Sequence, residues 1–402
     1  VAPLGPNVNG FEHDIANFIG NNSKFHTAAL TSGTAALHLA LRMLNVGKDD
    51  VVIVQSFTFC GTTNPVSYQG AELVFIDSEL DTWNMCPNAL HEALEHYKNR
   101  SVKAIMPVHL YGMPAKMDEI QKIADEYNVP IIEDAAEALG SVYKGKLCGN
   151  FGDYSILSFN GNKIVTSGGG GAIVTNDLDL GIKAKHLTTT AKVPHPYEYV
   201  HDEIGYNFRM PNLNAALACA QIEQLESFIQ NKRNLALDYS TFFETKGINF
   251  RTELPNTKAN YWLMCLELEN KKDRDLFLKE TNDNKVMTRP IWQLIFKSPL
   301  YSNFQKDYHA AIGNKLNHAK NAKVNVELMK RQGKIDLSVL NKEVSDRLYK
   351  SYTNDVLRMG NLIREVGLPA YEMPSANLYS KVFKFAVDNK QGIMHPAQIL
   401  LN

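Results

Sequence analysis

A lysine in the segment Ser158–Lys163 has the setting of a reactive amine. An apolar strand pattern ends at Phe159, Lys163 follows in a turn, and four glycines, Gly168–Gly171, come shortly afterwards. A lysine held over the edge of a sheet acts as a nucleophile and forms a Schiff base once its amine has lost its proton. Most lysines are solvated surface groups, so the surrounding chemistry has to decide between these two interpretations.

Two carboxylates follow a second apolar run, Ile131–Ile132. The run places Asp134 at the carboxyl end of a predicted strand, and Glu137 comes three residues later. In an enzyme that uses pyridoxal phosphate, an aspartate at this place pairs with the ring nitrogen and keeps it protonated, so that the ring can accept electrons. The competing interpretation is a carboxylate that caps the next helix.

The segment Thr31–Leu37 begins a predicted helix with hydroxyl groups and a glycine. Backbone N–H groups near Gly33 and Thr34, together with the helix dipole, would hold a phosphate. The segment is not a P-loop, because the pattern GxxxxGK[ST] does not occur in it. An ordinary capped helix is the alternative.

Two further segments carry aromatic and polar groups. Phe59 belongs to the segment Ser56–Phe59, which comes directly after the strand pattern Val51–Val54, and its ring would stack on a flat ligand. Core packing is the more frequent role of a single phenylalanine. Asn207 lies in the loop Gly205–Met210, which is either a functional polar loop or a simple entry to the next helix. Each signal is weak alone, and their common position after strands strengthens them.

The elements that must position these groups alternate between short apolar runs and amphipathic helices such as Met117–Tyr127. This alternation predicts an α/β fold with a mostly parallel sheet covered on both faces, in which ligands bind beyond the carboxyl ends of the strands. The predicted strands are Val51–Val54, Leu73–Ile76, Lys103–Val108, Val129–Ile132, Tyr154–Phe159 and Ala172–Thr175.

The rest of the chain predicts two further parts. A long helix is expected from Leu213 to Leu235, which would close a large cofactor-binding domain at residues 1–235. Residues 236–300 predict a small α+β domain, and residues 301–402 a helical C-terminal segment of unknown role. The elements expected in the small domain are strands at Ile248–Phe250, Tyr261–Leu268 and Val286–Arg289 and a helix at Lys272–Lys279.

Composition excludes several classes of function. The chain has 402 residues, with 42 Lys and Arg against 43 Asp and Glu, and a formal charge of −1. This balance gives no support for nucleic-acid binding or attachment to a membrane surface. The 5 cysteines form no CxxC or Cys/His cluster, so no metal site is expected. No apolar run is long enough to span a membrane, and a cytoplasmic location is the expectation.

Taken together, these segments resemble the DegT/DnrJ/EryC1/StrS family of sugar aminotransferases, which have the fold of pyridoxal phosphate-dependent transferases of fold type I. The resemblance extends over residues 1 to about 300. It implies a seven-stranded-type sheet flanked by helices. The segments that carry it are TSGTAALHLAL, SFTF, FIDSELDTWNM, PVHLYGMPAKMDEI, IIEDAAEALGS, GDYSILSFNGNKIVTSGGGG, GYNFRMPNLNAALACAQIEQLE and TRPIW.

The resemblance implies a role for each candidate residue. Lys163 would form the Schiff base with the cofactor and act as the general base, and Asp134 would pair with the ring nitrogen. Glu137 takes the place where many members have Gln near the ring hydroxyl. The remaining roles would be phosphate binding by Gly33, Thr34 and Ser158, ring stacking by Phe59, and contact of Asn207 with the cofactor of a second subunit in a homodimer.

The segments IEDAAEALGS and SFNGNKI are most similar to those of members that aminate C4 of nucleotide-linked 4-keto-6-deoxy sugars. The usual amino donor of the family is L-glutamate. Dehydration on the same cofactor is one alternative, but relatives that dehydrate carry His in place of Lys163. A catalytically silent or regulatory protein that retains the fold is a second alternative.

Both ends of the chain depart from the family. The sequence starts at Val1 without Met, so we expect a further N-terminal segment in the natural protein. Residues from about Ser302 to Asn402 show no resemblance to the ending of the small domain in the family. A fused module, a divergent ending and a rearranged gene are the alternatives for this segment.

Overall fold

A computed structural model of the chain describes residues 5–20, 24–301 and 399–401. Within these ranges the chain forms two compact units. The first comprises residues up to 242, residues 250–264 and residues 292–301, and the second comprises residues 243–249, 265–291 and 399–401. The predicted helical segment 301–402 lies outside the described residues, apart from Tyr301 and the short strand β14 (Ile399–Leu401).

The first unit is built on a central β-layer. A three-stranded sheet of order β3-β2-β4 is entirely parallel, and a four-stranded sheet has the order β1-β9-β8-β5. Parallel bridges from Ile105 to Ile131 and from Val108 to Asp134 join β4 to β5, so the two sheets form one continuous layer. The strands are β1 (His26–Leu30), β2 (Val51–Gln55), β3 (Glu72–Ile76), β4 (Val102–Met106), β5 (Ile132–Asp134), β8 (Tyr154–Ser158) and β9 (Gly171–Thr175).

The comparison with the predicted layer is close but not complete. The mostly parallel arrangement is confirmed, and the antiparallel pairs are confined to the edge where β9 lies between β8 and β1. The strand predicted at Val129–Ile132 begins only at Ile132, because pairing with β8 starts there. β1 was not predicted, since its apolar run is short and only Thr31 and Ser32 separate it from the apolar helix α2 (Gly33–Met43).

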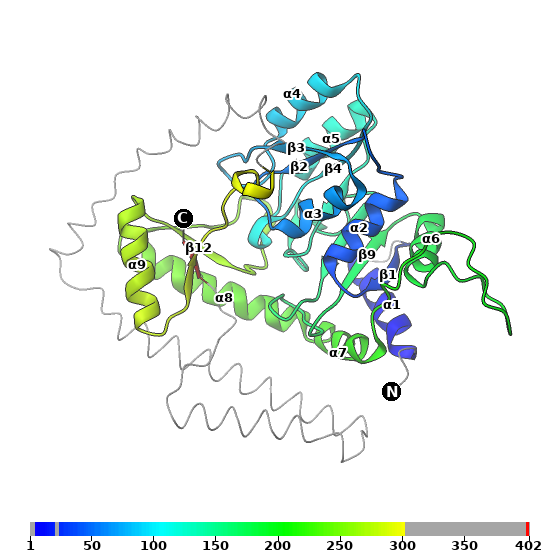
Figure 1. The fold of residues 1–402 in the computed structure, drawn as a ribbon. Helices are drawn as coiled ribbons and strands as arrows, with labels where there is room; N and C mark the ends of the chain where they lie inside the picture. Colours follow the sequence, from blue (N-terminus) through cyan, green and yellow to red (C-terminus); the bar gives the residue numbers. More distant parts are fainter. Residues whose placement is uncertain (1–4, 21–23, 302–398, 402) are drawn as a thin grey trace, which may run out of the picture. The chain divides into compact units, whose positions relative to one another are not determined.

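Alternation along the strands explains why both faces of the layer are covered. Val52 and Val54 of β2 point into a core shared with α2 (Gly33–Met43), whereas Val51 and Ile53 point into a core shared with other helices. Figure 1 shows α2 and α3 on one side of β2–β4, and α4 and α5 on the other. Each fully buried valine contributes about 1.5–3 kcal/mol, so a strand with four consecutive apolar residues favours a place between two layers of helices.

The other helices of this unit pack around the same layer. The predicted helix Met117–Tyr127 is present as α5 with those bounds. The long helix predicted from Leu213 to Leu235 is instead two helices, and the difference arises at Gln224, whose N–H bonds to Gln221 in a tight i−3 turn. The remaining elements are α1 (Pro6–Gly20), α3 (Cys60–Gln69), α4 (Pro87–Tyr97), α6 (Leu178–Thr188), α7 (Asn212–Ile222), α8 (Leu225–Glu244), the short strands β6 (Val142–Tyr143), β7 (Lys146–Leu147) and β11 (Thr257–Lys258), and the 3₁₀ turns η1 (Leu110–Gly112), η2 (Ile295–Lys297) and η3 (Pro299–Tyr301).

The second unit contains a smaller sheet of order β10-β12-β14-β13 with the helix α9 (Lys271–Asp283). A hydrogen bond of 2.6 Å joins the hydroxyls of Thr281 in α9 and Thr288 in β13, and both residues are buried. Each predicted element of the small α+β part has an observed counterpart, with shifted bounds. The strands are β10 (Asn249–Phe250), β12 (Met264–Glu267) and β13 (Thr288–Pro290). No helix in the described part of the chain is long and apolar enough to cross a lipid bilayer.

Candidate active site

The predicted chemical groups meet in one cavity at the carboxyl ends of β5 and β8. The cavity has a volume of about 320 Å³ and is bounded by residues of the first unit. All but one of the candidate residues line this cavity, so they are neighbours in the folded chain. These residues are Gly33, Thr34, Phe59, Asp134, Glu137, Ser158 and Lys163.

Asp134 is fixed at the end of β5 by bonds to its backbone and its side chain. Its N–H donates to the carbonyl of Pro107 at 2.9 Å, and its carbonyl accepts from the N–H of His109 at 3.2 Å. The side chain accepts from Thr62 Oγ1 on Oδ2 at 2.7 Å and from the N–H of Ala136 on Oδ1 at 3.2 Å. Burial raises the pKa of Asp134, and the bond from Thr62 opposes that rise. The result is a buried carboxylate in one orientation.

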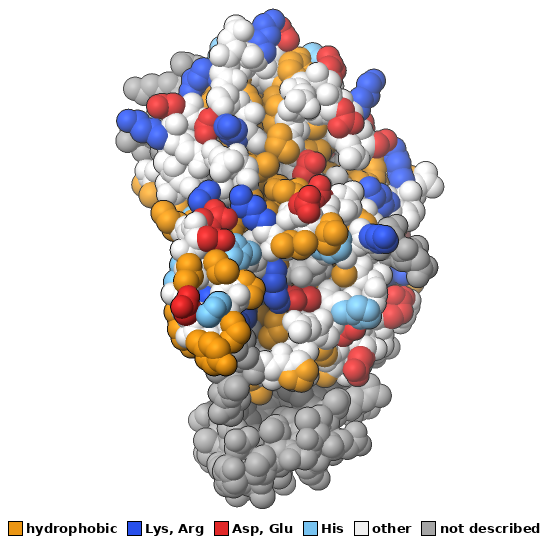
Figure 2. Space-filling model, turned by 90° about the vertical axis from the view of Figure 1, so that its right-hand side faces the viewer, with side chains coloured by type: hydrophobic (Ala, Val, Ile, Leu, Met, Phe, Trp, Pro, Cys, Tyr) orange, Lys and Arg blue, Asp and Glu red, His pale blue; other side chains and the backbone are white. Residues whose placement is uncertain are grey.

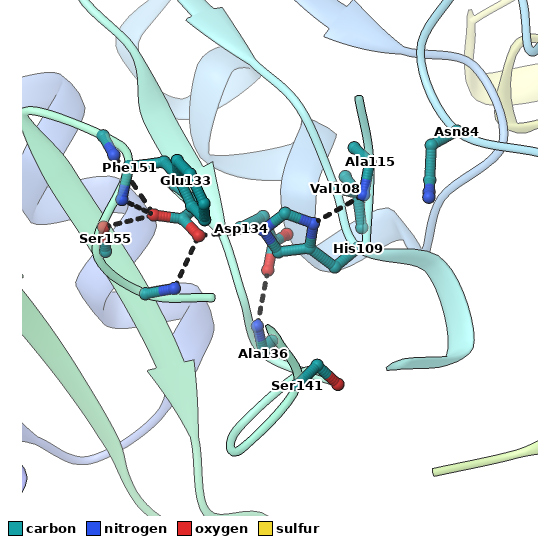
Figure 3. A network of polar contacts seen from close by, with 12 residues as sticks. Asn84, Val108, His109, Ala115, Glu133, Asp134, Ala136, Ser141, Phe151 and Ser155 are labelled. Atoms are coloured by element: carbon teal, nitrogen blue, oxygen red, sulfur yellow. Dashed lines mark hydrogen bonds and ion pairs between the residues drawn. The ribbon is translucent and has the colours of Figure 1, made fainter. Parts of the chain in front are cut away.

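Glu133 points to the other side of the strand and holds the layer together behind the cavity (Figure 3). It is fully buried, and its carboxylate accepts hydrogen bonds from Ser155 Oγ at 2.7 Å and from His109 Nε2 at 2.8 Å, besides three backbone N–H groups. His109 Nδ1 accepts from the N–H of Ala115 at 3.0 Å, so Nε2 carries the proton. Burial alone would raise the pKa of Glu133, but the bonds from His109 and the other donors hold it below its ordinary value.

A buried cysteine, Cys148, lies beside Glu133 and His109. His109, Glu133 and Cys148 have ligand atoms within 4.8 Å of one another. The oxygens of Glu133 and both ring nitrogens of His109 are already engaged in hydrogen bonds, so these atoms have no free lone pair for a metal ion. This cluster therefore acts as structural support beneath Asp134.

Lys163 reaches the cavity from the loop between β8 and β9. The loop is closed by the Phe159 N–H, which donates to the carbonyl of Gly170 at 2.9 Å, and the Lys163 N–H donates to the carbonyl of Asn160 at 3.0 Å. The indole of Trp262 donates to the carbonyl of Asn162 at 2.7 Å, and the Nζ atom of Lys163 lies 3.8 Å from the centroid of that ring. The side chain is only 13% exposed, so its amine faces the cavity rather than bulk water.

Glu137 is the acidic residue that lies beside the amine of Lys163. Its Oε1 lies 3.6 Å from Nζ of Lys163, and its Oε2 accepts from the N–H of Tyr111 at 2.7 Å. Tyr111 adopts a left-handed φ of 57°, an uncommon conformation for a bulky residue that turns its N–H toward Glu137. Burial raises the pKa of Glu137 to about 7, against the opposing charge of Lys163.

The first turn of α2 forms a polar cradle on another wall. Ser32 caps the helix by accepting from the N–H of Ala35 at 3.1 Å, and the first-turn N–H groups of a helix have no partner within it. A Cβ on Gly33 would lie 3.1 Å from Cβ of Ser158, and one on Gly171 would lie 2.2 Å from the carbonyl carbon of Ser32. Glycine at these places allows the helix start and β9 to approach closely enough to form an anion site.

An aromatic wall completes the cavity. Phe59 is 55% exposed, and its ring centroid is 5.5 Å from that of Trp292. The backbone N–H of Trp292 donates to the hydroxyl of Tyr111 at 3.1 Å, which fixes the position of Trp292. Four further lining residues were given no role from the sequence, although the segment SFTF contains one of them and TRPIW another; they are Trp262, Trp292, Thr58 and Thr62.

Asn207 is the one candidate that the structure does not bring to the cavity of its own chain. It is exposed and bridges to Thr189 in the segment that follows α6. Its predicted contact with the cofactor of a second subunit stays a prediction.

The lining matches the parts of pyridoxal phosphate one by one. A shielded amine suits the aldehyde, a buried carboxylate suits the ring nitrogen, a helix start suits the phosphate, and an exposed aromatic face suits a flat ring. In this chain those groups come from Lys163, Asp134, the first turn of α2, and Phe59, and all of them line the same cavity.

Comparison with known proteins identifies the family. The sequence model of the DegT/DnrJ/EryC1/StrS aminotransferase family matches residues 1–325. The chain is 45% identical over 304 residues to the "Putative pyridoxal phosphate-dependent aminotransferase EpsN" of Bacillus subtilis, with coverage of 75% of this chain and 77% of the relative. It is 36% identical over 307 residues to GDP-perosamine synthase of Escherichia coli O157:H7, with coverage of 76% and 82%.

A solved structure agrees with these relatives. The crystal structure of DesV from S. venezuelae superposes with a TM-score of 0.68 at 29% identity, over 79% of this chain and 82% of that one. The chain belongs to the DegT/DnrJ/EryC1/StrS family and is a pyridoxal phosphate-dependent sugar aminotransferase of fold type I.

Proposed function

We propose that this aminotransferase replaces the keto oxygen at C4 of a nucleotide-linked 4-keto-6-deoxy sugar with an amino group taken from L-glutamate. The observation that carries the proposal is the shielded amine of Lys163 in one cavity with the buried carboxylate of Asp134. The similarity to GDP-perosamine synthase supports a nucleotide-linked sugar as the substrate. The resemblance of the segment around Asp134 to members that aminate C4 supports the position of the new amine.

Bound pyridoxal phosphate supplies an aldehyde that carries the amino group and a ring that accepts electrons. Lys163 supplies the amine that anchors the cofactor, and when released from it moves the proton that the amino donor loses. Asp134 holds the ring nitrogen in its protonated form, because an ionised carboxylate accepts that N–H. Trp262 limits the positions of Lys163 by its ring and by its bond to Asn162.

The other lining residues orient the cofactor. Gly33, Thr34 and Ser158 bind the phosphate at the first turn of α2, where backbone N–H groups and the helix dipole favour an anion. Phe59 covers one face of the ring. Glu137 contacts the ring hydroxyl in the place that many members of the family give to Gln. At neutral pH its raised pKa allows it to donate a hydrogen bond, as an amide would.

We infer a homodimer with shared active sites, in which Asn207 contacts the phosphate held by the partner. The segment after α6 supports this inference, because it exposes large apolar side chains that a second copy would cover. The most exposed are Tyr197, Tyr199 and Ile204, at 88%, 80% and 75%. Figure 2 shows the side of the molecule on which α6 lies in Figure 1, where hydrophobic side chains gather in patches between charged ones.

Borohydride trapping tests the central assignment. Pyridoxal phosphate is added to the purified chain, the mixture is reduced, and the modified peptide is mapped by mass spectrometry. We expect the label on Lys163. The variant Lys163→Ala should show neither this label nor turnover. A label on another lysine, or full turnover of this variant, would refute the role of Lys163.

A substrate panel tests the reaction itself. Nucleotide-linked keto sugars are incubated with L-glutamate, and the product masses are measured. An amino group in place of the C4 keto oxygen, with formation of 2-oxoglutarate, supports the proposal. Loss of water from the sugar would show dehydration instead, and a labelled chain that converts none of the sugars would indicate a protein that retains the fold without this activity.

A further inference from the structure

Two threonines form a buried chain of hydroxyls that ends on Asp134. Thr62, in α3, has its Oγ1 at 2.7 Å from Oδ2 of Asp134. Thr58, which precedes the helix, has its Oγ1 at 2.7 Å from that of Thr62. Thr62 is 1% exposed and Thr58 is 2% exposed, so both hydroxyls are shielded from bulk water. Both side chains also line the cavity.

The direction of the protons along this chain follows from the donor count. An ionised carboxylate accepts hydrogen bonds and donates none, so the single hydroxyl proton of Thr62 goes to Asp134. The Thr62 oxygen is then left as an acceptor, and the bond of 2.7 Å requires Thr58 to be its donor. The alternative acceptor for Thr58, the carbonyl of Phe59, is farther away at 3.4 Å. The two hydroxyls therefore point the same way, and each strengthens the other.

This arrangement fixes both oxygens of the carboxylate. Oδ1 accepts from the N–H of Ala136, which belongs to the backbone and is present whatever the side chains are. Oδ2 has Thr62 as its side-chain donor, and this bond is the largest of the contacts that favour the ionised form, ahead of the Ala136 N–H and the charges of Lys163 and His109.

We propose that Thr62, itself oriented by Thr58, is a positioning residue that holds the Asp134 carboxylate ready to accept the hydrogen bond of the cofactor's ring nitrogen. The inference rests on the role proposed above for Asp134. It adds a residue whose effect on the cofactor is exerted through Asp134.

The neighbouring residue offers a matched control. Thr63 is in the same helix, is fully buried, and has its Oγ1 at 2.9 Å from the hydroxyl of Tyr301 and 3.3 Å from the carbonyl of Cys60. It does not line the cavity. Thr63→Val removes a buried hydroxyl of the same kind as Thr62→Val does, but only the latter removes a donor to Asp134.

The test compares Thr62→Val, Thr62→Ser and Thr63→Val with the unchanged chain. The measurements are the dissociation constant of pyridoxal phosphate by absorbance titration at several pH values, the turnover number, and the midpoint of unfolding without cofactor. Hydrogen bonds to charged groups are typically worth a tenfold to 100-fold change in an equilibrium constant, so we expect Thr62→Val to lose about that factor in turnover. Thr62→Ser should restore it to within a few-fold, because it keeps the hydroxyl.

The pH dependence gives a readout that a merely structural role would not move. Without its donor Asp134 takes up a proton at a higher pH, so the loss of cofactor binding on acidification should move upward by about one pH unit for each tenfold effect. The other titratable groups that act on Asp134 are Lys163, His109 and Glu137, and all three are unchanged in these variants. Thr63→Val should leave the pH profile in place.

Asp134→Asn separates the two claims. If it leaves turnover and the cofactor absorbance unchanged, the proposed role of Asp134 fails. If it has a large effect while Thr62→Val behaves as Thr63→Val does, only the present inference is overturned. Should Thr62→Val fail to fold, Thr58→Val provides the second test. This variant removes the hydroxyl that donates to Thr62, so the pH profile should shift in the same direction as for Thr62→Val but by less.

Discussion

Replacement of Glu137 by Gln isolates the effect of a buried acid on the stability of the empty protein. Burial raises the pKa of this group from 4.5 to about 7. The folded chain thus holds a proton on Glu137 that the unfolded chain has released, and its stability falls as pH rises between these two values. At 1.36 kcal/mol per unit, the full loss is about 3 kcal/mol, of which about 2 kcal/mol falls between pH 5.5 and pH 8.5.

Glutamine has nearly the same shape and no charge. Its oxygen still accepts from the N–H of Tyr111, which bonds to Glu137 at 2.7 Å. The free energy of unfolding of Glu137→Gln should therefore exceed that of the unchanged chain by about 2 kcal/mol more at pH 8.5 than at pH 5.5. Urea unfolding without cofactor at pH 5.5, 7 and 8.5 measures this difference. A gap between the two proteins that stays constant over the range would refute the argument that Glu137 is protonated by burial.

Three further substitutions follow from the same geometry. Asp134→Asn should lower turnover by roughly 10²–10³-fold, because the ring nitrogen loses its charged partner; near-normal turnover would contradict the assignment. Gly33→Ala should raise the dissociation constant of pyridoxal phosphate about tenfold, since the added Cβ would lie 3.1 Å from Cβ of Ser158, while Gly47→Ala, with nothing within 4 Å, should not. Glu133→Gln should lower the free energy of unfolding by about 3 kcal/mol, because its amide cannot accept from all of the buried donors, and an unchanged urea midpoint would argue against this.

The parts of the fold that were predictable from sequence depend on local patterns. α5 has its predicted bounds because its apolar face repeats with a helical period and Asn128 ends it in a left-handed conformation. The break between α7 and α8 was not predictable, because neither Gly nor Pro occurs there and the tight turn at Gln224 leaves no compositional signal.

The residues of the candidate site also fall into those that the sequence predicted and those that it did not. Asp134 was predicted because it ends a strand, and the carboxyl ends of parallel strands share an edge. Ser158, which ends β8, was implied only by the resemblance to the family. Trp262 was missed because it reaches Lys163 from a segment about a hundred positions away, a pairing that no local pattern encodes. Thr62 was missed for another reason, since a buried threonine in a helix resembles any other until its acceptor is known.

The cavity has a consequence for the order in which the protein assembles. Its lining begins at Thr31 and ends at Trp292, so almost the whole length of the first unit has to be in place before the ligand finds a complete set of contacts. Contacts over such long separations form slowly and late. Pyridoxal phosphate added during refolding should therefore stabilise the finished protein by mass action and leave the rate of the early collapse unchanged.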